Sequence, residues 1–244
     1  MKRLIRSEIR KVVTTRWFKI TMVVNAVLAI ISPAITTLTA PTAEDIGSSD
    51  FIHQVLSVSS GSSMVMLACG ISMMAGEFRH GTSTPTFLIT PRRRDVVLAK
   101  LAAVMGIGAV VGAVTFGLGV AVAIPSLSHE GVNHLAGDTP QMWIGAALAT
   151  ALYGALGVAL GAITRNTVVA IIGAVAWVFF IEGGLLVPAM PSIGKWLPTG
   201  ANIALTHTGK AQELLTPAIG GALLTAWVLM FSVLAVVGIQ RRDV

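Results

Sequence analysis

Six long runs of apolar residues divide this 244-residue sequence. Each run approaches or exceeds the roughly 20 residues that a helix needs to cross a bilayer. Only 11% of the residues are charged, whereas soluble globular domains carry about 25%. The sequence therefore predicts an all-α polytopic membrane protein, with one transmembrane domain over residues 1–244. The expected spans cover about residues 20–38, 58–76, 96–124, 142–163, 168–187 and 218–239. The third run is longer than a bilayer requires, which predicts tilt or a helical extension.

The basic residues predict the orientation of these spans. Most of the 17 Lys and Arg residues lie before the first run, between the second and third, and at the chain end. The alternate loops hold only Lys195 and Lys210. By the positive-inside rule both termini are cytoplasmic, as an even number of spans requires. We therefore expect a multi-pass protein of the cell membrane whose charged N-terminal segment is retained. The net charge of +6 then needs no nucleic-acid partner.

Residues 2–16 have the pattern of an amphipathic helix. At 100° per residue, one half of the circumference is apolar and most of the basic side chains fall on the other. The apolar set is Leu4, Ile5, Ile9, Val12 and Val13, and the basic set is Arg3, Arg6, Arg10 and Lys11. Such a helix lies in the headgroup layer of the membrane, with its basic face toward anionic lipids. A topological signal with no further role is the alternative.

The predicted cytoplasmic segment 77–95 combines acidic, aromatic and basic residues. They are Glu77, Phe78, Arg79, His80, Gly81 and Thr82, followed by Arg92, Arg93 and Arg94. Thr84 and Pro85 suit the start of a short helix that Pro91 would end. A short structured segment of this kind suits docking to a cytoplasmic partner. A solvated loop whose arginines only fix the topology is, on spacing alone, slightly favoured.

Two features near the opposite face are also candidates. Residues 188–216 form a long, mildly polar stretch in which prolines separate segments suited to short external helices. Glu182 stands about 24 Å along the fifth span, at 1.5 Å per residue. A carboxylate within a span is a functional candidate by default, here as a gate or part of a pathway. A solvated or capped structural role is equally open.

Small residues recur within the spans at helical spacing. Gly108 and Gly112 form one pair, and Gly154, Gly157 and Gly161 lie on one face of the fourth span. Small residues let helix backbones approach closely in lipid. Packing within one bundle and a dimer seam both explain them.

No catalytic motif is present in this sequence. It lacks G-x-x-x-x-G-K-[ST] and H-E-x-x-H, so neither a phosphate-binding loop nor a zinc-protease helix is expected. The single cysteine, Cys69, excludes an intrachain disulfide. His129 and His134 share one predicted external loop with Glu130 and Asp138, and a metal site or a membrane enzyme there is an alternative.

Taken together, these segments resemble the permease subunits of type-2 ATP-binding-cassette (ABC) transporters, in the style of small actinobacterial members. The resemblance covers essentially the whole chain. Its most specific parts are Ile5–Lys11, Gly76–Thr82, Pro91–Arg94 with Lys100 and Leu101, and the closing Arg241–Val244.

The resemblance implies a fold and a mechanism. In that family the second loop forms a coupling helix that docks into a cytoplasmic ATPase subunit. The glutamate that opens it corresponds to Glu77, with Arg79, Gly81 and Thr82 following the pattern. ATP and Mg²⁺ would be bound by that partner, no cofactor by this chain, and a second permease, identical or paralogous, would complete the pathway.

The family exports drugs, peptides, lipids or polysaccharide. The chain has no large external domain and no added cytoplasmic domain, which favours a minimal exporter of small amphiphiles. It is not expected to be an enzyme, because it has no nucleotide-binding motif. The alternative is a membrane immunity or signalling protein that binds a peptide or toxin without transporting it.

Overall fold

The structure is a computed structural model that describes residues 2–39, 48–57, 61–79, 81, 93–129, 137–206 and 215–241. Over these residues it is helical and contains no strand. Six of its helical segments are long and apolar enough to cross a membrane, which confirms the number of spans predicted. The elements are α1 (Lys2–Thr14), α2 (Arg16–Leu38), α4 (Ser49–Ser57), α5 (Gly61–Arg79), α7 (Arg93–His129), α8 (Thr139–Thr164), α9 (Thr167–Val175), η2 (Ala176–Leu186), α10 (Val187–Ala189), α11 (Pro191–Gly194), α12 (Pro198–Leu205) and α13 (Pro217–Arg241).

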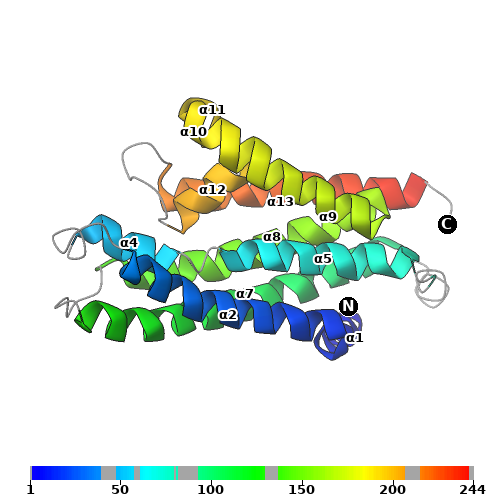
Figure 1. Cartoon of the computed structure of the whole chain (residues 1–244). Coiled ribbons are helices and arrows are strands. Elements are labelled where there is room, and N and C mark those ends of the chain that lie inside the picture. Colours follow the sequence, from blue (N-terminus) through cyan, green and yellow to red (C-terminus); the bar gives the residue numbers. More distant parts are fainter. Residues whose placement is uncertain are drawn as a thin grey trace.

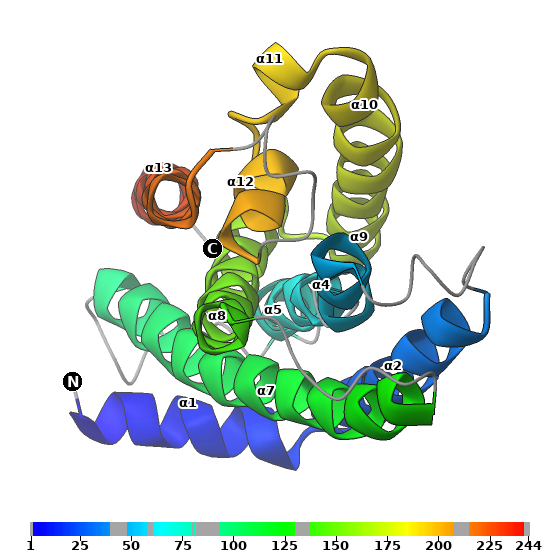
Figure 2. The same cartoon turned by 90° about the vertical axis from the view of Figure 1, so that its left-hand side faces the viewer.

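Helix α8 lies at the centre of the bundle, with α5, α7 and α13 packed around it (Figure 2). Glycines make this packing close. A Cβ on Gly157 would lie 2.1 Å from the Leu67 carbonyl oxygen of α5, and one on Gly108 would lie 2.8 Å from Ala151 Cα of α8. Gly112, Gly154 and Gly161 are in similarly close contact with neighbouring helices. The predicted small-residue faces therefore serve packing within the chain, where close backbone approach replaces the missing hydrophobic driving force.

Helix α1 lies across one end of the bundle. It runs lengthwise in Figure 2, where α8 and α13 are seen end-on, and α13 ends at the same end of the molecule (Figure 1). Thr15 separates α1 from α2: its backbone is extended and its side chain accepts a hydrogen bond from Phe18 N–H. Among the described residues, every Lys and Arg except Lys195 belongs to a segment at this end.

Helix α7 has 37 residues, a length of about 55 Å at 1.5 Å per residue. The apolar core of a bilayer is only about 30 Å thick. The helix runs obliquely to α8 (Figure 2), as the excess length of the third run predicted. Its far end packs against α4, through Phe116, Ala123 and Leu127.

Helix α4 is an element that the sequence analysis did not predict. Phe51, Ile52, Val55 and Leu56 are buried in a second apolar core with the far end of α7 and the start of α8. Their spacing puts them on one face of a helix, which was the available signal. The second candidate span therefore begins at Phe51, earlier than the expected residue 58.

The fifth span is irregular and is followed by short helices. Helix α9 continues into the π-helix η2, whereas a regular span over 168–187 was expected. Within residues 188–216, α11 and α12 are the expected short helices, and each begins at a proline, Pro191 and Pro198.

Candidate functional site

Four charged side chains from three separate segments meet at the end of the bundle where α1 lies. Lys100 Nζ of α7 donates to Glu8 Oε2 of α1 at 2.6 Å and to Glu77 Oε1 of α5 at 2.8 Å. Lys11 Nζ donates to Glu8 Oε1 at 2.7 Å and lies 3.6 Å from Glu77 Oε1. We call these four residues the Lys100 cluster. It joins helix α1 to the end of α5 and the start of α7.

The Lys100 cluster is electrically balanced, and its two central members are buried. The Lys100 side chain is 0% exposed and that of Glu8 1% exposed. Two carboxylates face two ammonium groups, so the cluster carries no net charge. Removing one member of such a buried group leaves an uncompensated charge, which is strongly destabilising. The three segments are therefore held in one arrangement by groups that are costly to separate.

The pKa values of the α1 members reflect these contacts. Burial alone would raise the pKa of Glu8, but the ammonium groups of Lys100 and Lys11 outweigh it and hold the pKa below its usual range. Burial would likewise lower the pKa of Lys11, and the Glu8 and Glu77 carboxylates outweigh it and raise that pKa. Both groups are thus stabilised in their charged forms.

The residues predicted to couple to a partner fall into distinct environments. Glu77 belongs to the Lys100 cluster, and Phe78 beside it packs against the main apolar core. The Arg165 guanidinium lies 5.1 Å from the centre of the Phe78 ring, which ties the end of α5 to the turn after α8. Arg79, at the end of α5, is exposed.

The remaining coupling residues are only partly described. Gly81 is exposed with φ +67°, a left-handed conformation that favours glycine. Arg93 begins α7, and Arg94 is exposed with its Nε 3.6 Å from Asp95 Oδ1. His80, Thr82 and Arg92 lie outside the described residues. So does the short helix expected from Thr84 to Pro91.

Helix α1 presents a different face to the bundle than its apolar pattern alone suggests. Glu8 and Val12 are its buried residues, whereas Leu4 and Ile5 are only partly buried. Ile9 is exposed, as are the basic residues Arg6, Arg10 and Lys11. The sequence analysis gave Glu8 no role. Two signals could have paired Glu8 with Lys100. Glu8 is an acidic residue on a basic helix, and Lys100 is a lysine inside an apolar run.

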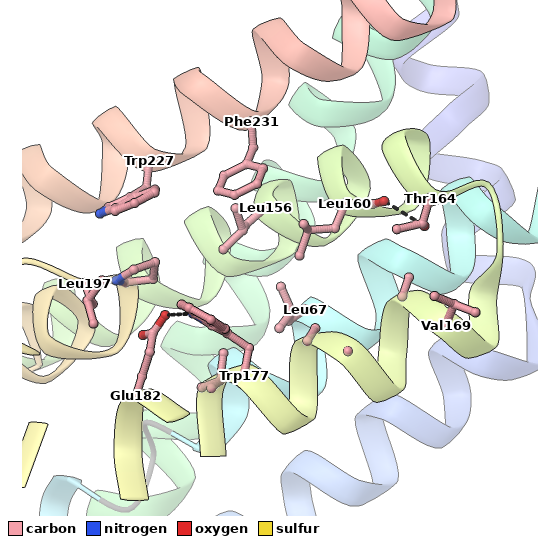
Figure 3. Close-up of a pocket in the computed structure, with 15 residues that line it drawn as sticks. Leu67, Leu156, Leu160, Thr164, Val169, Trp177, Glu182, Leu197, Trp227 and Phe231 are labelled. Carbon is pink, nitrogen blue, oxygen red and sulfur yellow. Dashed lines mark hydrogen bonds between the residues drawn. The ribbon is translucent and has the colours of Figure 1, made fainter. Parts of the chain in front are cut away.

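A second candidate site is an apolar cavity of about 390 Å³ that borders α8 (Figure 3). It lies between α5, α8, α9, η2, α12 and α13. Apart from Glu182 and Thr164 its lining is apolar or aromatic, and includes Leu67, Leu156, Trp177, Leu197, Trp227 and Phe231. Helical periodicity does not reveal these aromatic residues as a set, because they come from separate spans.

Glu182 is completely buried in the wall of this cavity. Its Oε1 accepts a hydrogen bond from the Trp177 indole N–H, and its Oε2 accepts one from the Thr199 backbone N–H at 2.7 Å. Trp177 and Glu182 are five residues apart, so in a regular helix at 100° per residue their side chains would point about 140° apart. The i→i+5 geometry of the π-helix η2 brings them to one side, and such π segments are frequent at functional sites. Glu182 is therefore capped by protein donors.

At the opposite end of the bundle from α1, His53 Nε2 and Asp138 Oδ1 lie 2.8 Å apart and join α4 to the start of α8. His134 and Glu130, which shared the suggested metal loop with Asp138, lie outside the described residues. Over the part of the chain that the structure describes, no three His, Cys, Asp or Glu side chains gather as metal ligands do.

The sequence matches no known protein-family model, and a search of curated proteins finds no significant match.

Proposed function

We propose that this chain is the transmembrane permease subunit of an ATP-driven ABC exporter, powered by a separate cytoplasmic ATPase subunit. The observation that carries the proposal is the Lys100 cluster. It ties α1 to Glu77 at the end of α5 and to Lys100 near the start of α7. Those two helices flank the segment expected to dock the ATPase. A force applied to that segment would act directly on two spans and on α1.

The distribution of charge supports the proposed orientation. The end of the bundle with α1 holds nearly all the described basic residues, and we assign it to the cytoplasm by the positive-inside rule. Helix α1 then lies in the inner headgroup layer, with Arg3, Arg6 and Arg10 available to anionic lipid. The short helices α11 and α12 lie toward the external face.

The remaining parts of the proposal concern partners. ATP and Mg²⁺ are bound by the ATPase subunit. A second permease, either another copy or a paralogue, pairs with this one. Helix α2 exposes Ile20, Val23 and Val27 along one side, which suits lipid or that second permease. The cargo is a small amphiphile such as a drug, peptide or lipid, moved outward.

Purification from native membranes in mild detergent, followed by reconstitution, tests the proposal. We expect an ABC ATPase to co-purify in stoichiometric amount. ATP hydrolysis should depend on that subunit. Transport of cargo across the membrane of the proteoliposomes should require ATP. If the chain instead protected cells fully against a peptide or toxin without any ATPase, it would be identified as an immunity or signalling protein.

Glu77→Ala tests the coupling role. The variant loses one member of the Lys100 cluster and should be less stable, so transport is compared for equal amounts of folded complex. That complex should still hydrolyse ATP, but ATP should no longer drive transport. Asp95→Asn is a matched control, because Asp95 is a partly exposed carboxylate at the same end and lies outside the Lys100 cluster. Equal transport by the Glu77→Ala and Asp95→Asn variants would remove Glu77 from the coupling path.

A further inference from the structure

The cavity wall contains a buried carboxylate that has no counter-ion within the described part of the chain. Glu182 accepts two hydrogen bonds, from Trp177 and Thr199, and both donors are neutral. None of the described basic side chains forms an ion pair with it. This contrasts with Glu8, whose buried carboxylate is neutralised by two lysines. Carboxylates inside membrane proteins are rare and generally pair with a cation.

The two hydrogen bonds do not fill the acceptor capacity of the carboxylate. Each carboxylate oxygen can accept about two hydrogen bonds, so one site on each oxygen remains. The residue is 0% exposed, so a cation in the cavity is attracted to it across the cavity wall rather than by direct contact. In Figure 3 the carboxylate of Glu182 lies beside the Trp177 ring at the edge of the cavity. The donors therefore fix the carboxylate in place without occupying its full capacity.

The rest of the lining favours a particular chemistry. Trp177, Trp227 and Phe231 contribute aromatic rings to the wall, and aromatic rings attract cations. The other lining residues are almost all aliphatic, and none is basic. An anion here would meet a carboxylate with no compensating charge. A strongly hydrated cation would lose its water to an apolar wall. An organic cation with a large apolar surface satisfies both constraints.

The cavity also has a size and an opening that suit such a ligand. Its volume of about 390 Å³ falls in the range of about 300–1,000 Å³ that is typical of small-molecule sites. Val169 is 60% exposed and Trp177 is 50% exposed, so the cavity opens on the outer surface of the bundle beside α9. In a membrane that surface faces lipid, from which an amphiphilic cation can enter.

We propose that this cavity binds a lipophilic organic monocation, with Glu182 as its counter-ion and the aromatic rings around its apolar body. The interpretation as a cargo site rests on the proposed function, for which it names the substrate class. The binding itself is a property of this chain and can be measured without an ATPase.

The test uses the purified full-length chain in lipid nanodiscs and two probes of the same shape and opposite charge, tetraphenylphosphonium and tetraphenylborate. Binding is measured by isothermal titration and equilibrium dialysis, with empty nanodiscs subtracted. We expect saturable binding of one tetraphenylphosphonium per chain and no saturable binding of tetraphenylborate. Glu182→Gln should weaken binding of the cation at least tenfold. Equal binding of both probes, or an unchanged affinity of the Glu182→Gln variant, overturns the proposal.

A second pair of variants tests the location without touching the carboxylate. Gly173 lines the cavity and a Cβ there meets no atom within 4 Å, so Gly173→Leu should fill space without a backbone clash. Gly238 in α13 is equally free of contacts and lies outside the cavity. Binding should be lost in Gly173→Leu and kept in Gly238→Leu. Equal affinity in the two variants overturns the location. Failure of ATP-driven transport would instead refute only the proposed function.

Discussion

Lys100 Nζ lies 2.6 Å from Glu8 Oε2, although 92 residues separate the two in the chain. The contact places the N-terminal helix at a fixed position on α7, beside the end of α5. Because both side chains are buried, the contact is shielded from water and salt in a way that surface ion pairs are not.

Replacing Lys100 with Met should destabilise the protein by an amount on the order of 3–5 kcal/mol, because Glu8 and Glu77 lose their buried partner. Thermal or denaturant unfolding in detergent would measure this. The double variant Glu8→Gln/Lys100→Met should recover part of the loss, since it removes one of the unpaired charges. Lys19→Met is the control, because Lys19 is an exposed lysine in the first turn of α2. A similar effect of Lys100→Met and Lys19→Met would contradict the importance of the cluster.

The Lys100 cluster should also make stability depend on pH. The folded-state pKa of Glu8 is lowered from 4.5, so its contribution is fully present above about pH 4.5 and is lost as pH falls through the lower folded value. The pKa of Lys11 is raised from 10.5, so its contribution is present below that value and is lost as pH rises through the folded one. The melting temperature of the native chain should therefore fall in acid, and that of Glu8→Gln should change less over the same range. Parallel acid profiles for the two proteins would argue against this assignment.

Two glycines on the same helix, α7, should respond oppositely to alanine. A Cβ on Gly108 would lie 2.8 Å from Ala151 Cα, so Gly108→Ala should separate α7 from α8 and lower stability by more than about 1 kcal/mol. A Cβ on Gly106 meets no atom within 4 Å, so Gly106→Ala should be neutral or stabilising by about 0.5–1 kcal/mol. Melting temperatures of the two variants provide the comparison, and equal shifts would show that α7 and α8 are less closely packed.

Arg165 ends α8 with φ 53°, in the left-handed region. Its guanidinium also contacts the Phe78 ring. Arg165→Ala and Arg165→Gly both remove the cation–π contact, but only glycine relieves the backbone. The glycine variant should therefore be more stable than the alanine variant by about 1 kcal/mol, as unfolding curves can measure. In the Arg165→Ala background, Phe78→Leu should no longer cost the cation–π energy of about 0.5–1 kcal/mol.

The sequence predicted the helices better than it predicted their contacts. Membrane spans are readable because each must present about 20 apolar residues to lipid, and the six expected spans appear as six long apolar helices. Helix α1 was predicted for the same kind of reason, from its 100° periodicity. The π-helical part of the fifth span was not, because residues 176–186 are apolar in a way that fits a regular helix equally well.

The site residues show a similar division. Glu182 stood out in the sequence because a carboxylate within a span is costly. Glu77 stood out because the family resemblance maps it to the glutamate that opens the coupling helix. Their partners did not, because Lys100 and Thr199 are brought to them only by tertiary structure. Pairing of buried charges depends on which helices are neighbours, and hydropathy does not carry that information. The proposed coupling role of Glu77 and the proposed ligand of Glu182 both await the experiments above.

The length of α7 has a mechanical consequence. Its first turns hold Lys100 against α1 and α5, while its last turns pack on α4 near the opposite face. Its sequence holds no proline before Pro125, so a tilt at the start of the helix is carried along most of its length. Lys100 and Leu127 are 27 residues apart, about 40 Å at 1.5 Å per residue, so a tilt of a few degrees at the Lys100 end displaces the α4 end by a few ångströms. In the proposed transporter, a displacement at the cytoplasmic face would thus be carried toward the opposite face along one helix, without a relay of intermediate side chains.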